Sequence, residues 1–309
     1  MSVLLVSHRA CLGHENGEGH PECPDRLRAV LAALEGEEFA TLIQEEAPRA
    51  TPEQLARVHP PEYVQAILAI RPEPGETVML DGDTGMNGHS AEAALRAAGA
   101  GIAAVDAVCR GEVRRAFCAV RPPGHHAEPR RPMGFCLFAN ATVAARHAQA
   151  AHGIARVAVL DFDVHHGNGT QAAVEADPSI LFLSSHQSPC YPGTGMEHET
   201  GVGNVLNATL EPGADSAAFR AVWRDRLLPA LEAFRPGLVV VSAGFDAHAR
   251  DPLAQLRLRE ADFGWLTGQI CGIADRLCGG RVVSTLEGGY DLDALAASAA
   301  SHVRALMNA

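Results

Sequence analysis

The sequence predicts an α/β fold built on one mostly parallel β-sheet of about eight strands, with helices on both faces. Three observations predict it. The strand candidates are continuously apolar and rich in β-branched residues, as in strands that are buried on both faces. Helical patterns alternate with these strands, which is typical of a parallel sheet with crossover helices. Polar motifs follow several strand candidates directly, at the edge where open parallel sheets bind ligands.

The first strand candidate is Ser2–Ser7, whose short apolar run excludes a signal peptide or a membrane span there. Five further apolar runs predict buried strands: Ala116–Val120, Arg156–Phe162, Ile180–His186, Leu238–Ala243 and Val282–Leu286. The helical patterns cover Asp25–Leu34, Ser90–Cys109, Leu137–Ala151, Ala217–Phe234, Ala261–Cys278 and Leu292–Met307. Since no repeat, low-complexity tract or linker interrupts this order, we expect one domain spanning residues 1–309.

Composition limits the function classes. Hydrophobic residues make up 47% of the chain, which is typical of a globular protein, and we expect a cytoplasmic protein with no membrane partner. The eight cysteines form no CxxC pair, so we expect them to be reduced and mostly buried. The formal charge of −12 argues against a nucleic-acid partner and is compatible with cationic substrates. All 25 basic residues are arginine, which excludes lysine-based Schiff-base, PLP and phosphate-loop chemistry.

Four polar motifs stand just after strand candidates. They are Arg121–His126, Asp163–Asn168, Phe245–Asp251 and Glu287–Tyr290. Because the carboxyl ends of parallel strands meet at one edge of a sheet, we expect these motifs to lie close together. Their shared position indicates a binding site more strongly than any single motif does.

Two of these motifs carry potential metal ligands. Asp163 and His165 lie two residues apart at a strand end, so both side chains leave on the same side. Asp246 stands at the tip of another buried strand. Carboxylate and imidazole groups can hold one catalytic zinc and leave a position open for water. Taken alone, the first pair also fits a polar turn, and Asp246 also fits a helix cap. Asp161 faces away from such a metal or lies deeper, and a buried carboxylate needs a cation or a donor.

Paired histidines occur in the first motif. His125 and His126 suit proton transfer to and from a metal-bound water, although such a pair alone also fits an ordinary loop. Together, the histidine pair, the Asp163–His165 motif and Asp246 indicate a metal-dependent hydrolase.

The chain resembles the histone deacetylase family of the arginase–deacetylase superfamily, and among its members the class II-like bacterial deacetylases. The matching text spans nearly the whole chain: His20–Leu27, Val58–Tyr63, Arg121–His126, Met133–Cys136, Asp161–Thr170, Tyr191–Gly195, Ala243–Asp246 and Glu287–Tyr290. The resemblance implies the arginase–deacetylase fold and a deacetylase activity.

The resemblance also implies roles for the motif residues. One zinc ion, or iron in its place, would be held by Asp163, His165 and Asp246, with water completing the site. His126 would act as the general base and then as the acid that protonates the leaving amine. Tyr290 would donate to the scissile carbonyl and then to the oxyanion; some relatives carry histidine there and are weak on acetyl-lysine, so the tyrosine implies an active deacetylase.

Both histidines would have oriented partners. His125 would hydrogen-bond the water and stay largely cationic, because its counterpart Asp161 is an anion. His126 would pair with Asn168, where class I relatives carry aspartate. A neutral amide orients an imidazole without raising its pKa as a carboxylate would, which favours a neutral base at neutral pH.

The family's substrate tunnel accepts an acyl-lysine chain, and Gly134, Phe135 and Tyr191 match its wall. Arg26 matches an arginine of the internal acetate-exit channel, and Asp83 matches a rim aspartate that grips the substrate backbone. The resemblance further implies a potassium ion, held by the backbone carbonyls of Asp161, Asp163, His165 and Ser185, the Ser184 hydroxyl and the Asp161 carboxylate.

Two deacetylase substrates compete. Polyamine-selective eukaryotic relatives place a glutamate seven residues after the aspartate ligand to bind a secondary ammonium, whereas this chain has Leu253 there. A leucine penalises a buried cation by desolvation, and the long insertion of bacterial acetylpolyamine amidohydrolases is absent. We therefore expect acyl-lysine or another small acyl-amide as substrate, with acetylpolyamine as the alternative that the negative charge supports.

Other function classes stay open. An arginase-like ureohydrolase would need a second carboxylate beside Asp246, where Ala247 and His248 stand. A catalytically silent acyl-lysine binder, or a regulatory relative of the acetoin-utilisation type, would share the same motifs. The family name implies no histone partner, and the sequence leaves the oligomeric state open.

Overall fold

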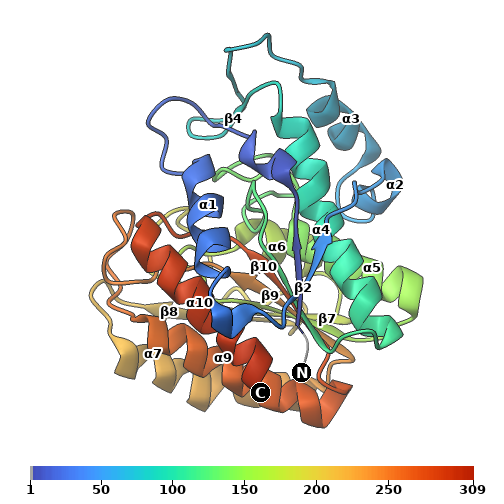
Figure 1. Ribbon diagram of the computed structural model, residues 1–309. Helices are drawn as coiled ribbons and strands as arrows, with labels where there is room; N and C mark the ends of the chain where they lie inside the picture. The colour runs from blue at the N-terminus through green and yellow to red at the C-terminus, as the bar shows by residue number, and fades with distance from the viewer. Residues whose placement is uncertain (1–2) are drawn as a thin grey trace.

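A computed structural model describes residues 3–309 and places an eight-stranded sheet at the centre of the molecule (Figure 1). The strand order is β2-β1-β5-β10-β9-β6-β7-β8, and every neighbouring pair is parallel. The strands are β1 Val3–Ser7, β2 Ile43–Glu46, β5 Arg115–Cys118, β6 Val157–Asp161, β7 Ile180–Gln187, β8 Val205–Leu210, β9 Leu238–Ala243 and β10 Val282–Leu286. A separate antiparallel pair joins β3 Val78–Met79 and β4 Gly85–Met86.

Helices cover both faces of the sheet (Figure 1). One face is packed by α4 Ser90–Arg110, α5 Asn140–His152 and α6 Asn168–Val174. The other carries α1 Pro24–Ala33, α7 Ser216–Val222, a π-helical turn Trp223–Leu227, α8 Leu228–Phe234, α9 Glu260–Cys278 and α10 Leu292–Asn308. The short helices α2 Pro52–Leu55 and α3 Pro61–Ala69 pack beside α5 and the upper part of α4, and 3₁₀ turns occupy Arg9–Leu12 and Glu37–Phe39. The α/β prediction of a mostly parallel sheet with helices on both faces is confirmed.

The central strands form the core because both of their faces are covered. All residues of β6 and β9 are buried, as the continuous apolar pattern predicts. The edge strand β2 is instead exposed at every position, and its sequence Ile-Gln-Glu-Glu gave no signal of a buried strand. Carboxylates on an exposed edge also discourage pairing with another sheet.

The predicted elements begin and end within two residues of the observed ones, apart from two helices and one residue that lies outside the described part of the chain. Ser2, the first residue predicted for the opening strand, lies outside the described residues. The helix predicted from Leu137 begins at Asn140, whose side chain donates to the Pro122 carbonyl at 3.1 Å. The helix predicted over Ala217–Phe234 contains the π-helical turn ahead of Pro229, a residue that cannot donate a backbone hydrogen bond.

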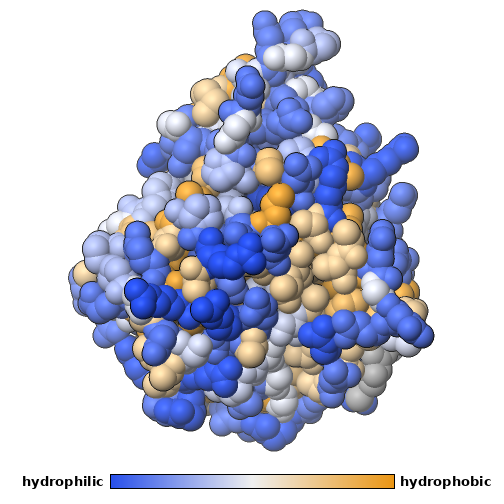
Figure 2. Space-filling model, turned by 60° about the vertical axis from the view of Figure 1, so that its left-hand side comes forward, coloured by the Kyte–Doolittle hydropathy of each residue, from blue (hydrophilic) through white to orange (hydrophobic). Residues whose placement is uncertain are grey.

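Hydrophilic residues cover most of the face seen in Figure 2, interrupted by smaller apolar patches. Within residues 3–309, no helix combines the length and apolar character that crossing a bilayer requires. All eight cysteines are free thiols.

Candidate active site

The predicted ligands Asp163, His165 and Asp246 converge at the carboxyl edge of the sheet. They follow β6 and β9, which are hydrogen-bonded neighbours with Asp161 in register with Ser242. One ligand atom from each residue lies within 4.8 Å of the others. The His165 Nδ1 atom is 3.2 Å from both an Asp163 and an Asp246 carboxylate oxygen. The strand register therefore brings together Asp163 and Asp246, which are 83 positions apart in the sequence.

The arrangement fits a metal ion. The backbone N–H groups of Gly288 and Val164 donate to Asp163 and Asp246, at 2.8 and 2.9 Å, and fix both carboxylates. The Asp246 Oδ2 atom is buried and accepts no hydrogen bond. Burial and the neighbouring Asp163 carboxylate raise the pKa of Asp246. Two buried carboxylates beside an imidazole need a cation between them, and this donor set suits zinc.

Two glycines leave room for these carboxylates. A Cβ atom on Gly244 would overlap the Asp163 carboxylate, and one on Gly288 would overlap the Asp246 carboxylate. Each glycine belongs to a motif that the sequence places after a strand. The motif glycines therefore allow the backbone to approach the ligands closely.

The histidine pair lies beside this centre with the predicted partners. His125 Nδ1 is 2.9 Å from the Asp161 carboxylate, and His126 Nδ1 is 2.8 Å from Asn168 Oδ1. The Asn168 amide nitrogen donates to Glu128, so its oxygen is the atom that accepts from His126. His126 Nδ1 therefore carries the proton, and its Nε2 is left free to accept another.

Charges separate the two histidines. Burial opposes protonation of His125, but the Asp163 and Asp161 carboxylates outweigh it and raise its pKa to about 10. Burial and the cationic neighbour His125 lower the pKa of His126 well below its ordinary value. These shifts favour a cationic His125 and a neutral His126, the states that the family resemblance implies.

A cavity of about 230 Å³ leads from the surface to this centre. It is lined by residues from all the predicted tunnel segments: Asp83, His126, Gly134, Phe135, His165, Tyr191, Leu253 and Tyr290. The Tyr191 ring meets the His126 ring edge-on, and the Phe135 ring meets the Tyr290 ring in the same way. The walls are mostly aromatic and aliphatic, while the histidines and Tyr290 place polar atoms in the cavity.

The tunnel wall near His126 depends on an unusual backbone. Gly134 and Phe135 both have positive φ angles, of 55° and 68°. A Cβ atom on Gly134 would collide with the His126 ring. Glycine is therefore required where the wall touches the proposed base, and Phe135 is held in a strained conformation that turns its ring into the cavity.

Arg26 does not line the cavity. It is fully buried behind Tyr290, with its Cζ atom 4.9 Å from the centroid of that ring. Its guanidinium donates to the carbonyls of Gly289 and Glu287 and forms an ion pair with Glu22 at 3.0 Å. The acetate-exit-channel role that the resemblance implies for Arg26 stays a prediction; in the structure its guanidinium holds the loop that carries Tyr290.

Sequence reasoning missed two positioning residues. Glu287 accepts hydrogen bonds from the backbone N–H groups of Gly124 and His125, at 2.6 and 3.1 Å. Asp251 accepts from the N–H groups of Tyr290 and Leu253, at 2.7 and 3.0 Å. Both residues lie inside polar motifs that follow strands in the sequence. That position is the signal by which their positioning role could have been predicted.

The residues implied for potassium lie on neighbouring strands. Asp161 of β6 is in register with Ser184 of β7. The Ser184 hydroxyl hydrogen-bonds the His186 ring at 2.8 Å, and the Ser185 hydroxyl accepts from Trp223 at 2.9 Å. The structure brings the carbonyl-bearing segments together, and the ion itself stays a prediction.

Comparisons with known proteins identify the family of this chain. The family model described as "Histone deacetylase domain" matches residues 20–306. Histone deacetylase 14, chloroplastic, from Arabidopsis thaliana is 42% identical over 324 residues, which cover 98% of this chain and 76% of that protein. A histone deacetylase-like amidohydrolase from Pseudomonas aeruginosa is 43% identical over 278 residues, with coverage of 88% and 73%. The crystal structure of the HDA15 HD domain matches with a TM-score of 0.93 at 37% identity, covering 99% of this chain and 88% of that one.

Proposed function

This chain belongs to the histone deacetylase domain family, and we propose that it is a zinc-dependent amidohydrolase that removes acetyl or other short acyl groups from acyl-lysine or a related small acyl-amide. One observation carries the proposal. The buried trio of Asp163, His165 and Asp246 lies at the end of an apolar cavity that also holds His126 and Tyr290. These are the groups that hydrolysis of an amide with metal assistance requires.

The proton-transfer role falls to His126. Its Nδ1–H is held by Asn168, so Nε2 can accept a proton from the attacking water. The same Nε2–H then protonates the leaving amine. His125, kept cationic by Asp161, orients the water by donating a hydrogen bond to it. A zinc ion bound by Asp163, His165 and Asp246 would lower the pKa of that water and polarise the acyl carbonyl.

Tyr290 is our candidate for stabilising the oxyanion. It lines the cavity, and its backbone N–H is fixed by Asp251 while Arg26 packs against its ring. Burial raises the pKa of the phenol well above its ordinary value, so the hydroxyl keeps its proton and can donate it as a hydrogen bond.

The cavity favours an uncharged chain next to the acyl group. Leu253 and the rings of Phe135 and Tyr191 line it, and this lining suits the methylene groups of acyl-lysine. Asp83 at the same opening supplies an acceptor for a substrate backbone N–H. That carboxylate is also the observation that favours the second candidate, an acetylpolyamine, whose distal ammonium groups would pair with it.

The remaining alternatives have less support. A ureohydrolase with two metal ions needs a further carboxylate at Asp246, but His248 turns toward Glu260 at 3.2 Å and accepts from the Arg250 N–H. A silent binder would not need a base with a free Nε2 beside the metal ligands. We also propose that a potassium ion occupies the carbonyl-rich segments of Asp161–His165 and Ser184–Ser185, as in the family.

The test is a panel of kcat/KM values for acetyl-lysine peptides, longer acyl-lysines and N-acetylated putrescine, cadaverine and spermidine, measured with and without a chelator. We expect turnover of acyl-lysine that the chelator abolishes and zinc restores. An acetylpolyamine preferred by about a hundredfold, or roughly 2.7 kcal/mol of transition-state stabilisation, would replace the acyl-lysine proposal. Turnover that resists the chelator would contradict the metal mechanism.

A further inference from the structure

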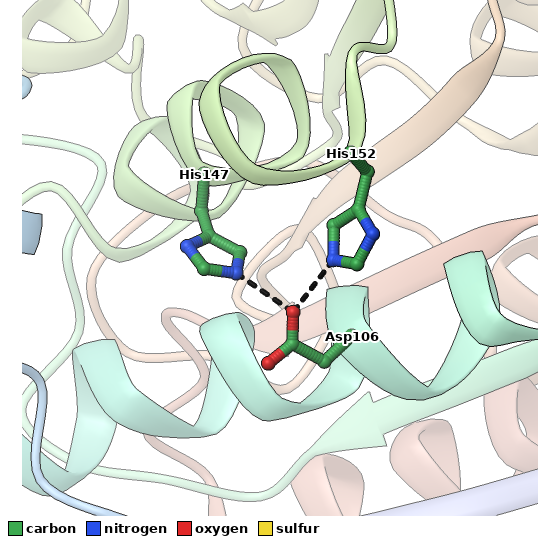
Figure 3. Close-up of side chains that lie close together, drawn as sticks. All are labelled: Asp106, His147 and His152. Atoms are coloured by element: carbon green, nitrogen blue, oxygen red, sulfur yellow. Dashed lines mark hydrogen bonds and ion pairs between the residues drawn. The ribbon is translucent and has the colours of Figure 1, made fainter.

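A second cluster of metal-binding side chains lies outside the active site. Asp106 projects from α4, and His147 and His152 project from α5, toward one another (Figure 3). The Asp106 Oδ1 atom is 2.8 Å from His147 Nε2 and 2.6 Å from His152 Nε2. Among residues 3–309 this is the one other group of three potential ligands whose donor atoms fall within 4.8 Å of each other.

The cluster is remote from the catalytic edge of the sheet. Asp106 lies one turn before the end of α4, just before the chain enters β5. His152 is the last residue of α5, just before the chain enters β6. The active-site residues follow the opposite, carboxyl ends of these two strands. The second cluster therefore lies at the amino ends of the strands, and the active site lies at their carboxyl ends.

The donor set suits a divalent transition-metal ion. Two imidazole nitrogens and one carboxylate oxygen are ligands of zinc and of related borderline ions, and they leave further positions open to water. A tetrahedral site with bonds of about 2.0–2.1 Å needs donors roughly 3.3 Å apart, so the three groups must separate slightly. His152 and Asp106 can move, since their side chains are 20% and 30% exposed.

The hydrogen bonds of His147 determine how the ion would enter. Arg57 Nη1 is 2.7 Å from His147 Nδ1, and a guanidinium can only donate, so Nδ1 accepts and Nε2 carries the proton toward Asp106. An ion on Nε2 requires that proton to leave or move to Nδ1, where it would face Arg57. Arg57 is exposed and can turn into solvent. Arg110 lies 4.0 Å from the other Asp106 oxygen, Oδ2, and leaves Oδ1 available.

We propose that Asp106, His147 and His152 form a second metal site, which binds zinc or a similar divalent ion and ties α4 to α5. The ion would replace the two hydrogen bonds that now converge on Asp106 Oδ1. Arg57 competes with it, because it stabilises the tautomer of His147 that cannot bind through Nε2.

Zinc content tests the proposal. The holoenzyme, the variant His152→Ala and the matched control His198→Ala, which removes another exposed histidine, are equilibrated with zinc chloride, freed of unbound metal and analysed by mass spectrometry. We expect one zinc ion per chain fewer in His152→Ala than in the wild type and in His198→Ala. Equal zinc content in all three would overturn the second site and leave an ion pair only.

A second pair of variants separates this site from the catalytic one. Asp246→Asn should lose the catalytic ion yet keep the ion that depends on His152, so the two proposals can fail independently.

Arg57→Gln replaces the competing donor with a side chain that can accept from Nδ1–H. We expect it to tighten zinc binding at this site on the order of 10–100-fold, the size of effect that partners of ligating histidines have, in calorimetric titrations of the holoenzyme. Unchanged or weaker binding would overturn coordination through His147 Nε2.

Discussion

The two aspartate–histidine clusters of this molecule use the same kinds of ligands in different surroundings. Asp163 and Asp246 are almost fully buried and are fixed by backbone N–H groups, and one of their oxygens lacks any hydrogen bond. Asp106 is partly exposed, and its Oδ1 is already satisfied by both neighbouring histidines. The first cluster is incomplete without a cation, whereas the second can satisfy itself. Preorganisation, rather than ligand type, therefore distinguishes the proposed catalytic centre from the second cluster.

The largest expected effect comes from breaking the first cluster. Asp246→Asn keeps the acceptor for the Val164 N–H but removes the charge that holds the cation. We expect the variant to fold, to lose the catalytic zinc and to fall to background turnover of acetyl-lysine. The control is Asp106→Asn, which makes the same change in the second cluster and should retain turnover. Normal activity in Asp246→Asn would contradict the metal centre.

Tyr290→Phe tests the group that faces the first cluster across the cavity. Removing the phenol hydroxyl should lower kcat by roughly 10²–10³, the usual cost of an oxyanion donor, while zinc content is unchanged. Steady-state kinetics and metal analysis of the same preparation check both expectations. A fall in zinc content would place Tyr290 among the groups that hold the metal instead.

Asn168→Asp sharpens the comparison between the histidines. The partner of His126 is a neutral amide, whereas His147 meets the charged Arg57. A carboxylate at position 168 should raise the pKa of His126, so the acid limb of the kcat/KM–pH profile should move to higher pH by about one unit or more. The double variant with Glu128→Gln removes the repulsion from the carboxylate that Asn168 now contacts. An unmoved acid limb would show that the limb belongs to another group.

His302 is a buried histidine outside both clusters, and no carboxylate contributes to its pKa shift, so its pKa reflects burial alone. His302 hydrogen-bonds Thr267 and Ser284, and burial lowers its pKa to about 3. Below its ordinary pKa of about 6.5 the unfolded chain binds a proton that the folded chain does not. Stability should therefore fall as the pH drops from about 6.5 toward 3, by about 1.4 kcal/mol per pH unit from this group.

Urea unfolding between pH 7 and pH 4 measures that slope. In His302→Gln the slope should become shallower, whatever the loss of packing does to stability at pH 7. The same slope in both proteins would mean that His302 takes up its proton in the folded state.

The smallest effect on turnover is expected from the second cluster. Because Asp106 and His152 are partly exposed, a chelator titration of the zinc-loaded protein should remove the ion between α4 and α5 before the buried catalytic ion. Zinc release should then show two steps, and activity should fall only with the second. Loss of activity in step with the first release would contradict the separation of the two sites.

The sequence predicted the central strands of the sheet better than its edge strands or the contacts between residues that are far apart in the chain. Asp163, His165 and Asp246 were identifiable because each follows an apolar strand of the parallel sheet. The edge strands β2 and β8 were not: β2 is exposed throughout, and β8, although mostly buried, interrupts its apolar residues with Asn207 and Thr209. The roles of Asn168 and Tyr290 came from family resemblance, since spacing alone gives no partner for either. The Asp106 cluster was invisible, because only the packing of α4 against α5 joins a residue to partners 41 and 46 positions away.

Glu287 has a consequence for attempts to redesign this protein. One carboxylate, next to the Gly288–Tyr290 segment, holds the amides of Gly124 and His125. These hydrogen bonds join the loop that bears the proposed base to the loop that bears Tyr290, so we expect a change in one loop to disturb the other. Selectivity is better altered at Leu253 and Tyr191, which sit at the partly exposed entrance, than by changes to either of those coupled loops.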